Sequence, residues 1–218
     1  MNIQESFNQD FNVVSEYIKK MLFLQKSHYF YSNKNTEQEN FSCSYLIKPG
    51  LIVEIYSFLE FYLEKLVNLH LMTNEKDSYS NFIEKIHFPK GTSNLFKMIS
   101  YINNFFKYDF TKSLFYNDID NLRIIRNAIV HKGNFVKKLL KIKYVNCERI
   151  SKNTNIFFIT VQDEFFTLIL KSINNFLKFF LTILFLIYHI NRFLTPRTAY
   201  RTLHSSLNQC RLKIYLSL

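Results

Sequence analysis

Arg126, Asn127 and His131 are the residues whose types and spacing best suit a chemical role. We expect residues 118–132 to form a helix. On that helix Asn127 and His131 lie four apart on one face, and Arg123 lies one turn before them. Arg126 lies beside this line, and its forked guanidinium can reach toward His131. A histidine can move protons near neutral pH, and an arginine can bind phosphate oxygens and stabilise charge that develops on them. Asn127 can orient His131 or contact a phosphate.

This combination predicts cleavage of RNA, because RNA carries its own nucleophile in the 2′-hydroxyl beside each phosphate. The protein then has only to move protons and to hold charge. Lys132 and Arg123 are further cations that we expect to contact the RNA. No group of carboxylates, cysteines or histidines has the spacing of a metal site, and Cys43, Cys147 and Cys210 lie far apart in the chain. The expected reaction therefore uses no metal and no cofactor.

The segment RNAIVH at Arg126–His131 resembles the RNxxxH form of the Rx4-6H motif of the HEPN family. The segment YSFLEFYLEKL at Tyr56–Leu66 also looks like the earlier helix of HEPN proteins, which often directs a polar residue toward the site. Glu60 is the matching residue here, and Arg123 is a second supporting candidate. In helix order the resemblance covers residues 44–193.

The resemblance implies a helical, usually dimeric protein that acts as a metal-independent endoribonuclease. Proteins of this type act in toxin–antitoxin, abortive-infection and other antiphage systems, and two copies of the motif commonly face each other across a dimer. For this chain it implies a homodimer that cuts RNA and is restrained by an antitoxin or another regulatory partner.

Because we expect Arg126 and His131 on a solvent-facing surface, alanine at either position should leave the melting temperature nearly unchanged.

Other interpretations of the same residues stay open. The segment RNAIVHKG can be an ordinary amphipathic helix end, in which a cation and a histidine complement the helix dipole. The chain would then be a non-catalytic helical module that binds RNA, a nucleotide or a partner protein. Glu60 can simply reach solvent or pair with Lys65 or an arginine. A carboxylate on a helix that looks buried all round nevertheless requires a partner.

The composition favours a mainly helical protein. The chain has 218 residues, of which 48% are hydrophobic, and only 3 Gly and 3 Pro. It predicts an all-α bundle of five to six helices in one domain over residues 1–193, with a small β-hairpin before the last helix. The formal net charge of +11 favours a polyanion such as nucleic acid, although a basic composition can also lack a functional cause. The three separated cysteines and the absence of a secretory leader pattern predict a cytoplasmic protein.

Hydrophobic periodicity predicts the elements of the first half of the chain. Residues 7–31 have apolar side chains at helical spacing, and the polar residues 32–44 predict an exposed loop. Pro49 suits the start of the next helix, because its missing N–H would be unpaired there anyway. Residues 51–71 are apolar on nearly every face, which predicts a central helix. A shorter helix is expected at residues 81–87.

The helix that carries the motif has clear predicted ends and a clear predicted back. Asn117 or Asp118 is expected to open it, and Gly133 to end it. Its apolar back would hold it against the core, and this back comprises Leu122, Ile125 and Ile129, flanked by Ala128 and Ile124.

Helices are also expected on both sides of the motif helix. Thr92 or Ser93 is expected to cap the helix before it. After it, residues 156–161 have the composition of a strand, and residues 153–155 can form a turn, which together predict the hairpin. The final helix is expected over residues 163–192.

The end of the chain differs in composition from the rest. The longest uncharged apolar run, residues 179–191, falls short of the roughly 20 residues that span a bilayer. Lys171 and Lys178 interrupt any longer apolar stretch, so we expect a buried or dimer-forming helix and no membrane anchor. The alternative is a membrane-associated protein, which the final helix and the basic residues after it would support. Residues 194–218 are basic and contain no acidic residue. They predict a disordered RNA-binding arm or, alternatively, a cloning remnant or out-of-frame extension.

Overall fold

A computed structural model describes residues 3–32, 37–74, 84–86, 88–106, 109–113 and 115–193. This part of the chain is mainly helical, as the composition predicts, and it carries one small sheet. Its helices are α1 (Ile3–Ser32), α2 (Glu37–Asn74), α4 (Asn94–Phe106), the short 3-10 helix η1 (Phe110–Lys112), α5 (Tyr116–Lys132) and α6 (Asp163–Phe193). Its strands are β1 (Phe135–Val136), β2 (Val145–Arg149) and β3 (Phe157–Val161). The basic segment 194–218 lies outside the described residues.

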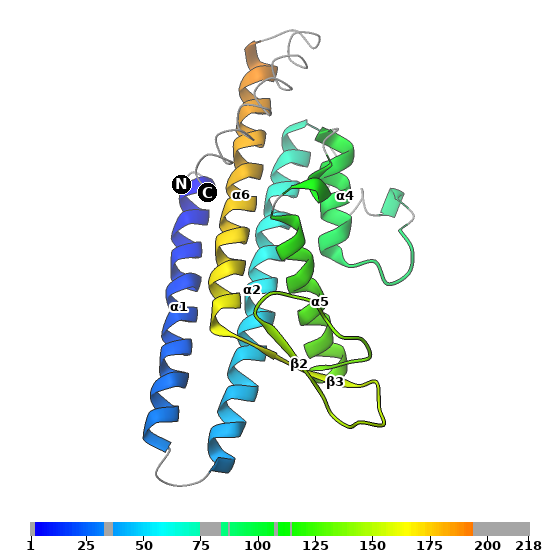
Figure 1. Ribbon diagram of the computed structural model, residues 1–218. Helices are drawn as coiled ribbons and strands as arrows, with labels where there is room; N and C mark the ends of the chain where they lie inside the picture. Colours follow the sequence, from blue (N-terminus) through cyan, green and yellow to red (C-terminus); the bar gives the residue numbers. More distant parts are fainter. Residues whose placement is uncertain are drawn as a thin grey trace.

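Helix α2 is the central helix, as its apolar sequence predicts. It contacts α1, α4, α5 and α6, and the long helices α1, α2 and α6 lie side by side (Figure 1). Ile52, Ile55, Leu59 and Leu63 of α2 are fully buried in the shared core. A helix surrounded by other helices needs apolar side chains on most of its faces, which explains this run.

The start of α2 corrects two of the predictions. Residues 37–44 are helical, so the predicted loop over residues 32–44 is wrong for most of its length. Pro49 lies inside the helix and does not begin it. The polar residues before Pro49 lack periodicity, and a proline usually costs a helix interior about 3 kcal/mol. The missing periodicity and the proline therefore both predicted that no helix runs through this part of the chain.

Tertiary contacts on both sides of Pro49 keep α2 continuous. Just before it, Ile47 packs against the core and Lys48 forms an ion pair of 2.8 Å with Asp163 of α6. Just after it, Leu51 and Ile52 are buried. These contacts offset the missing backbone hydrogen bond, because packing routinely overrides local propensity.

The other predicted helices agree with the structure where it describes them. Helices α1 and α6 match the predicted residues 7–31 and 163–192 to within a few residues. The predicted cap of α4 is Ser93, whose Oγ accepts a hydrogen bond from the Phe96 N–H at 3.3 Å. The helix predicted at residues 81–87 falls largely outside the described residues.

The predicted hairpin is present, and a third strand extends it. Strands β2 and β3 are antiparallel, with Cys147 opposite Ile159. Strand β1 pairs with the other edge of β3, which gives the order β1-β3-β2. The sequence did not predict β1, because two residues are too short to show an alternating pattern. The sheet lies at the end of α5 that carries the motif (Figure 1).

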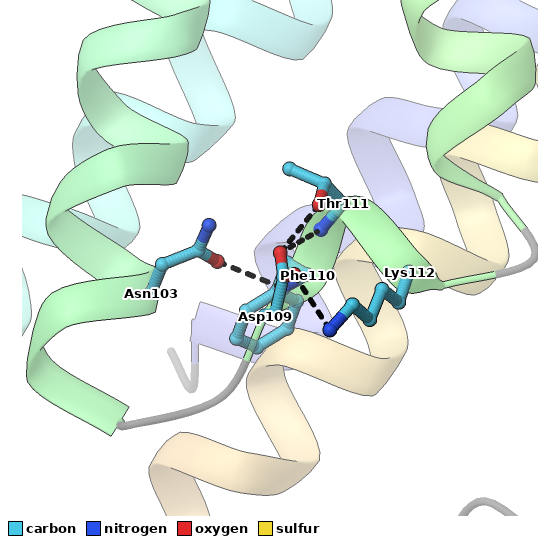
Figure 2. A network of polar contacts seen from close by, with 5 residues as sticks. All are labelled: Asn103, Asp109, Phe110, Thr111 and Lys112. Carbon is cyan, nitrogen blue, oxygen red and sulfur yellow. Dashed lines mark hydrogen bonds and ion pairs between the residues drawn. The ribbon is translucent and has the colours of Figure 1, made fainter.

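Helix η1 fastens the chain between α4 and α5 to the core (Figure 2). Asn103 of α4 accepts a hydrogen bond from the Phe110 N–H at 2.8 Å, and Asp109 accepts hydrogen bonds from the backbone and the hydroxyl of Thr111. Lys112 pairs with Asp109 at 3.4 Å. The Phe110 ring is fully buried and packs against the rings of Phe176, Phe179 and Phe180 of α6.

Helix α6 combines the hydropathy of a membrane span with the burial of a core helix. Over Asp163–Leu184 its mean hydropathy is 1.3, and it is long enough to cross a bilayer. In the most apolar stretch of the same helix, 56% is buried inside the protein. Its buried side chains include Phe166, Ile169 and Ile173. Packing against the other helices therefore accounts for much of its apolar surface.

Candidate active site

Helix α5 places the motif on the side opposite its buried back. Leu122, Ile125 and Ala128 are buried, as predicted, while Ile124 and Ile129 are partly exposed. The helix begins at Tyr116, one or two residues before the predicted start, and no side chain caps it. Asp118 instead accepts a hydrogen bond of 2.6 Å from the Ser172 hydroxyl of α6. This bond and the buried back fix the orientation of α5.

The end of α5 is fixed by the predicted glycine. Gly133 has a φ of 56°, in the left-handed region that a residue without a Cβ adopts most easily. Its N–H donates to the carbonyl of Ile129, and the Asn134 N–H donates to that of Ala128, both at 3.2 Å. The Gly133 bond is that of the αL motif, in which a left-handed residue after the helix donates to the carbonyl four residues before it and so satisfies a carbonyl at the helix end. The last turn, with His131, therefore has a defined backbone.

His131 and Lys132 lie on this last turn, and both are exposed. Within the part of the chain that the structure describes, no hydrogen bond or ion pair engages the His131 imidazole. An exposed imidazole can exchange a proton with a bound substrate or with water. The expectation that His131 faces solvent is therefore confirmed.

Arg126 departs from the same expectation. Its side chain is only partly exposed, and its guanidinium lies over the ring of Tyr56 in α2, with 5.2 Å to the ring centroid. Arg126 Nη1 donates to Asn127 Oδ1 at 3.1 Å, and Arg126 Nε is buried without a hydrogen-bond partner among the described residues. The position of Arg126 on α5 lies between the motif line and the buried back, so its long stem follows the contact between α2 and α5. The prediction that Arg126 faces solvent is therefore wrong for much of its side chain.

Glu60 lies near Arg126 but takes its hydrogen bonds from other groups. Burial raises the pKa of Glu60, and it outweighs the hydrogen bond from Tyr56, the charge of Arg126 and the hydrogen bond from the Leu95 N–H, which lower it. The Leu95 N–H belongs to the first turn of α4, where an anion is favourable. Burial also raises the pKa of Tyr56, and the charge of Glu60 adds to that rise. Glu60 of α2 therefore contacts the first turn of α4 through the Leu95 N–H, and it lies close enough to Arg126 of α5 to feel its charge.

The alternative partner that the sequence offered for Glu60 is occupied elsewhere. Lys65 lies over the rings of Phe61 and Tyr62, at 5.8 and 5.4 Å from their centroids. The arginine partner is therefore the better of the two sequence interpretations, although it acts through charge and Tyr56 makes the direct contact.

Arg123 is held by an acidic neighbour on its own helix. Its Nε lies 2.7 Å from Asp120 Oδ1, and each side chain is about one third exposed. The structure therefore brings together Arg126, Asn127, Tyr56 and Glu60. Arg123 acts on this group only through its charge, which lowers the pKa of Tyr56. Among the described residues no contact joins His131 to the group. Sequence reasoning missed Tyr56 and Asp120. Tyr56 lies four residues before Glu60, and Asp120 lies three residues before Arg123. Side chains at these spacings contact each other on a helix, which is the signal that could have found both residues.

The described part of the chain also forms a sizeable cleft, but it gathers no metal cluster. Among the residues that the structure describes, no three His, Cys, Asp or Glu side chains gather as metal ligands. A cleft of about 330 Å³ lies between α2, the end of α5 and the sheet. Its walls include Pro49, Ile129, Asn134, Asn146 and Gln162. It is separate from the Arg126 and Glu60 contacts.

Comparisons with protein-family models, curated proteins and solved structures found no match to this chain.

Proposed function

We propose that this protein is a metal-independent endoribonuclease of the RNxxxH HEPN type. One observation carries the proposal: α5 holds Arg126 and Asn127 as a hydrogen-bonded pair, with an exposed His131 one turn further on at a capped helix end. Arg126 supplies the cation and His131 the proton carrier that RNA cleavage requires, and the Asn127 amide can contact the phosphate.

In the proposed reaction the 2′-hydroxyl of the substrate attacks the adjacent phosphorus. One group accepts the hydroxyl proton, and the bond from phosphorus to the 5′-oxygen of the next nucleotide breaks as that oxygen takes a proton. The products are a 2′,3′-cyclic phosphate and a free 5′-hydroxyl. His131 is the residue that accepts or donates a proton in this reaction. The Arg126 guanidinium holds the phosphate oxygens on which charge develops.

A symmetric dimer is part of this proposal. In one chain Arg126 turns toward Tyr56 while His131 faces solvent at the end of α5. A second copy related by a two-fold axis would add a second arginine and a second histidine to one site. We therefore propose that the homodimer is the active form, with RNA as substrate, and that light scattering at tens of micromolar gives the mass of two chains.

The biological setting follows from the HEPN resemblance. We propose a cytoplasmic toxin or antiphage effector that an antitoxin or another regulatory partner restrains. The burial of α6 supports a core role for that helix and no membrane anchor.

A second candidate function is supported by the contacts of Arg126. A guanidinium held over Tyr56 beside a half-buried carboxylate can serve to join α2 to α5. The protein would then be a non-catalytic module that binds RNA, a nucleotide or a partner protein. In that case Arg126 matters for folding, and His131 has no chemical role.

One experiment separates the two functions. The purified protein is incubated with an RNA of known sequence in excess EDTA, beside the same RNA with a 2′-deoxy nucleotide 5′ of the cut. We expect cleavage with cyclic-phosphate ends, no cleavage at the 2′-deoxy position, and loss of cleavage in His131→Ala. The matched control is Lys20→Ala, an exposed residue of α1. Full cleavage by His131→Ala, or products with 5′-phosphates, would exclude the proposed roles.

A further inference from the structure

The segment that follows the motif carries most of the excess charge of the chain. Residues 132–152 contain one acidic residue, Glu148, and seven basic residues, all exposed: Lys132, Lys137, Lys138, Lys141, Lys143, Arg149 and Lys152. Seven positive charges against one negative give +6, more than half of the +11 of the whole chain. We call these seven residues the basic strip.

The connection between β1 and β2 directs its lysines outward. From Leu140 to Val145 the side chains alternate: Leu140, Ile142 and Tyr144 pack against the core. Lys141 and Lys143 between them are exposed. This alternation fixes which side of the segment faces solvent, so these two lysines are presented by packed apolar neighbours.

The same connection carries the charge across the sheet. Strands β1 and β2 are the two edges, and β3 lies between them. Both edges are antiparallel to β3, so the chain from β1 must cross β3 to begin β2. Lys137 and Lys138 lie at the β1 end of this crossing, and Lys143 lies at the β2 end. The charge is therefore spread along a path and is not gathered at one point.

The path begins at the candidate active site. Lys132 follows His131, and the Asn134 carbonyl accepts a hydrogen bond of 2.9 Å from the Ile159 N–H of β3. This bond fastens the end of α5 directly to the sheet. A polyanion bound at His131 can therefore continue onto the basic strip.

Within the described residues the cations of the strip contact only neutral groups: Lys143 lies over the Tyr144 ring, and Arg149 lies over the Phe157 ring and donates to Asn155 Oδ1. Their charges are therefore available to an external anion. Within the described part of the chain, none of its lysines forms an ion pair, whereas Lys26 and Lys48 both pair with Asp163. Phe135, 41% exposed, packs edge-on against Phe158 at 5.4 Å and lies two residues before Lys137 in the chain. An exposed ring among cations is the arrangement on which the bases of single-stranded nucleic acids stack.

We propose that the basic strip binds the backbone of single-stranded RNA that extends from the active site, and that Phe135 stacks on one of its bases. The proposal rests on the ribonuclease function and adds the surface along which the substrate lies. Lys and Arg bind phosphates largely without regard to sequence, so the strip contributes affinity and position.

The salt dependence of binding measures this contribution. Each phosphate neutralised on a single strand adds about 0.7 to the slope of log affinity against log salt. Removal of four contacts should lower the slope by about 3. Between 50 and 200 mM salt the wild-type protein should then lose about 50-fold more affinity than a variant without those four charges.

The test uses the full-length protein and a fluorescent 2′-O-methyl RNA of 20 nucleotides, which lacks the attacking hydroxyl. The strip variant carries Gln at Lys137, Lys138, Lys141 and Lys143. The control variant carries Gln at four exposed lysines of α1 and α6, namely Lys19, Lys20, Lys171 and Lys178. Both variants lose the same net charge. We expect a lower salt slope only in the strip variant, and Phe135→Ala should weaken binding without changing the slope.

Equal slopes in the two variants would overturn the proposal, because charge in general would then account for binding. Binding of the strip to vesicles of anionic phospholipid, with no effect of the strip variant on RNA affinity, would also overturn it in favour of a membrane surface. The ribonuclease function fails separately: there, wild-type protein would not cut RNA in EDTA even where the strip binds the uncut analogue.

Discussion

Replacing Arg126 with alanine should destabilise the protein, although the position belongs to the proposed active site. The substitution removes the guanidinium from the Tyr56 ring, a contact worth about 1 kcal/mol at a partly buried position. It also removes the hydrogen bond to Asn127, worth about 1 kcal/mol. Relief of the buried, unpartnered Nε returns part of this, so the expected net loss is about 1 to 2 kcal/mol.

Thermal unfolding followed by circular dichroism measures this loss. For a chain of this size each kcal/mol corresponds to about 2–4 °C, so Arg126→Ala should melt about 2–8 °C below the wild-type protein. The matched control is His131→Ala at the exposed end of the same helix, which should change the free energy of unfolding by less than about 0.5 kcal/mol. An Arg126→Ala variant that melts within about 1 °C of His131→Ala would refute the contact with Tyr56. Because the variant is less stable, its cleavage activity should be compared with wild type well below both melting temperatures.

Two further predictions concern Glu60 and Phe110. Burial holds the pKa of Glu60 above its ordinary value of 4.5, so the folded state favours the protonated carboxyl, and this stabilisation is complete below pH 4.5 and lost as the pH rises through the raised pKa. In urea titrations from about pH 4 to 7, the wild-type protein should therefore lose stability relative to the neutral Glu60→Gln variant, and parallel pH curves for the two proteins would contradict this. Phe110→Ala should lower the free energy of unfolding by about 3–5 kcal/mol, because the ring is fully buried against three rings of α6. The control is Phe61→Ala, whose ring is 57% exposed, and a similar small loss in both variants would show that η1 does not anchor the chain.

Local signals in the sequence determined most of the long helices and the C-terminal end of the motif helix. The apolar run of α2 and the spacing in α1 and α6 are properties of neighbouring residues, so the pattern alone reports them. Gly133 closes α5 as predicted, because its left-handed φ is a local requirement. The exposure of His131 likewise follows from its place on the helix face opposite the apolar back.

Only the tertiary structure decided that a helix continues through a proline and in which direction a long side chain points. Helix α2 runs through Pro49 because Ile47, Leu51 and Ile52 on either side of it pack into the core. Lys48 adds an ion pair with Asp163, a partner more than a hundred residues away. Arg126 turns toward Tyr56 because α2 packs against α5, and no sequence spacing encodes that contact. Strand β1 exists because β3 supplies its hydrogen bonds. Local patterns report what neighbours along the chain share, whereas burial and charge depend on partners that only the folded chain brings together.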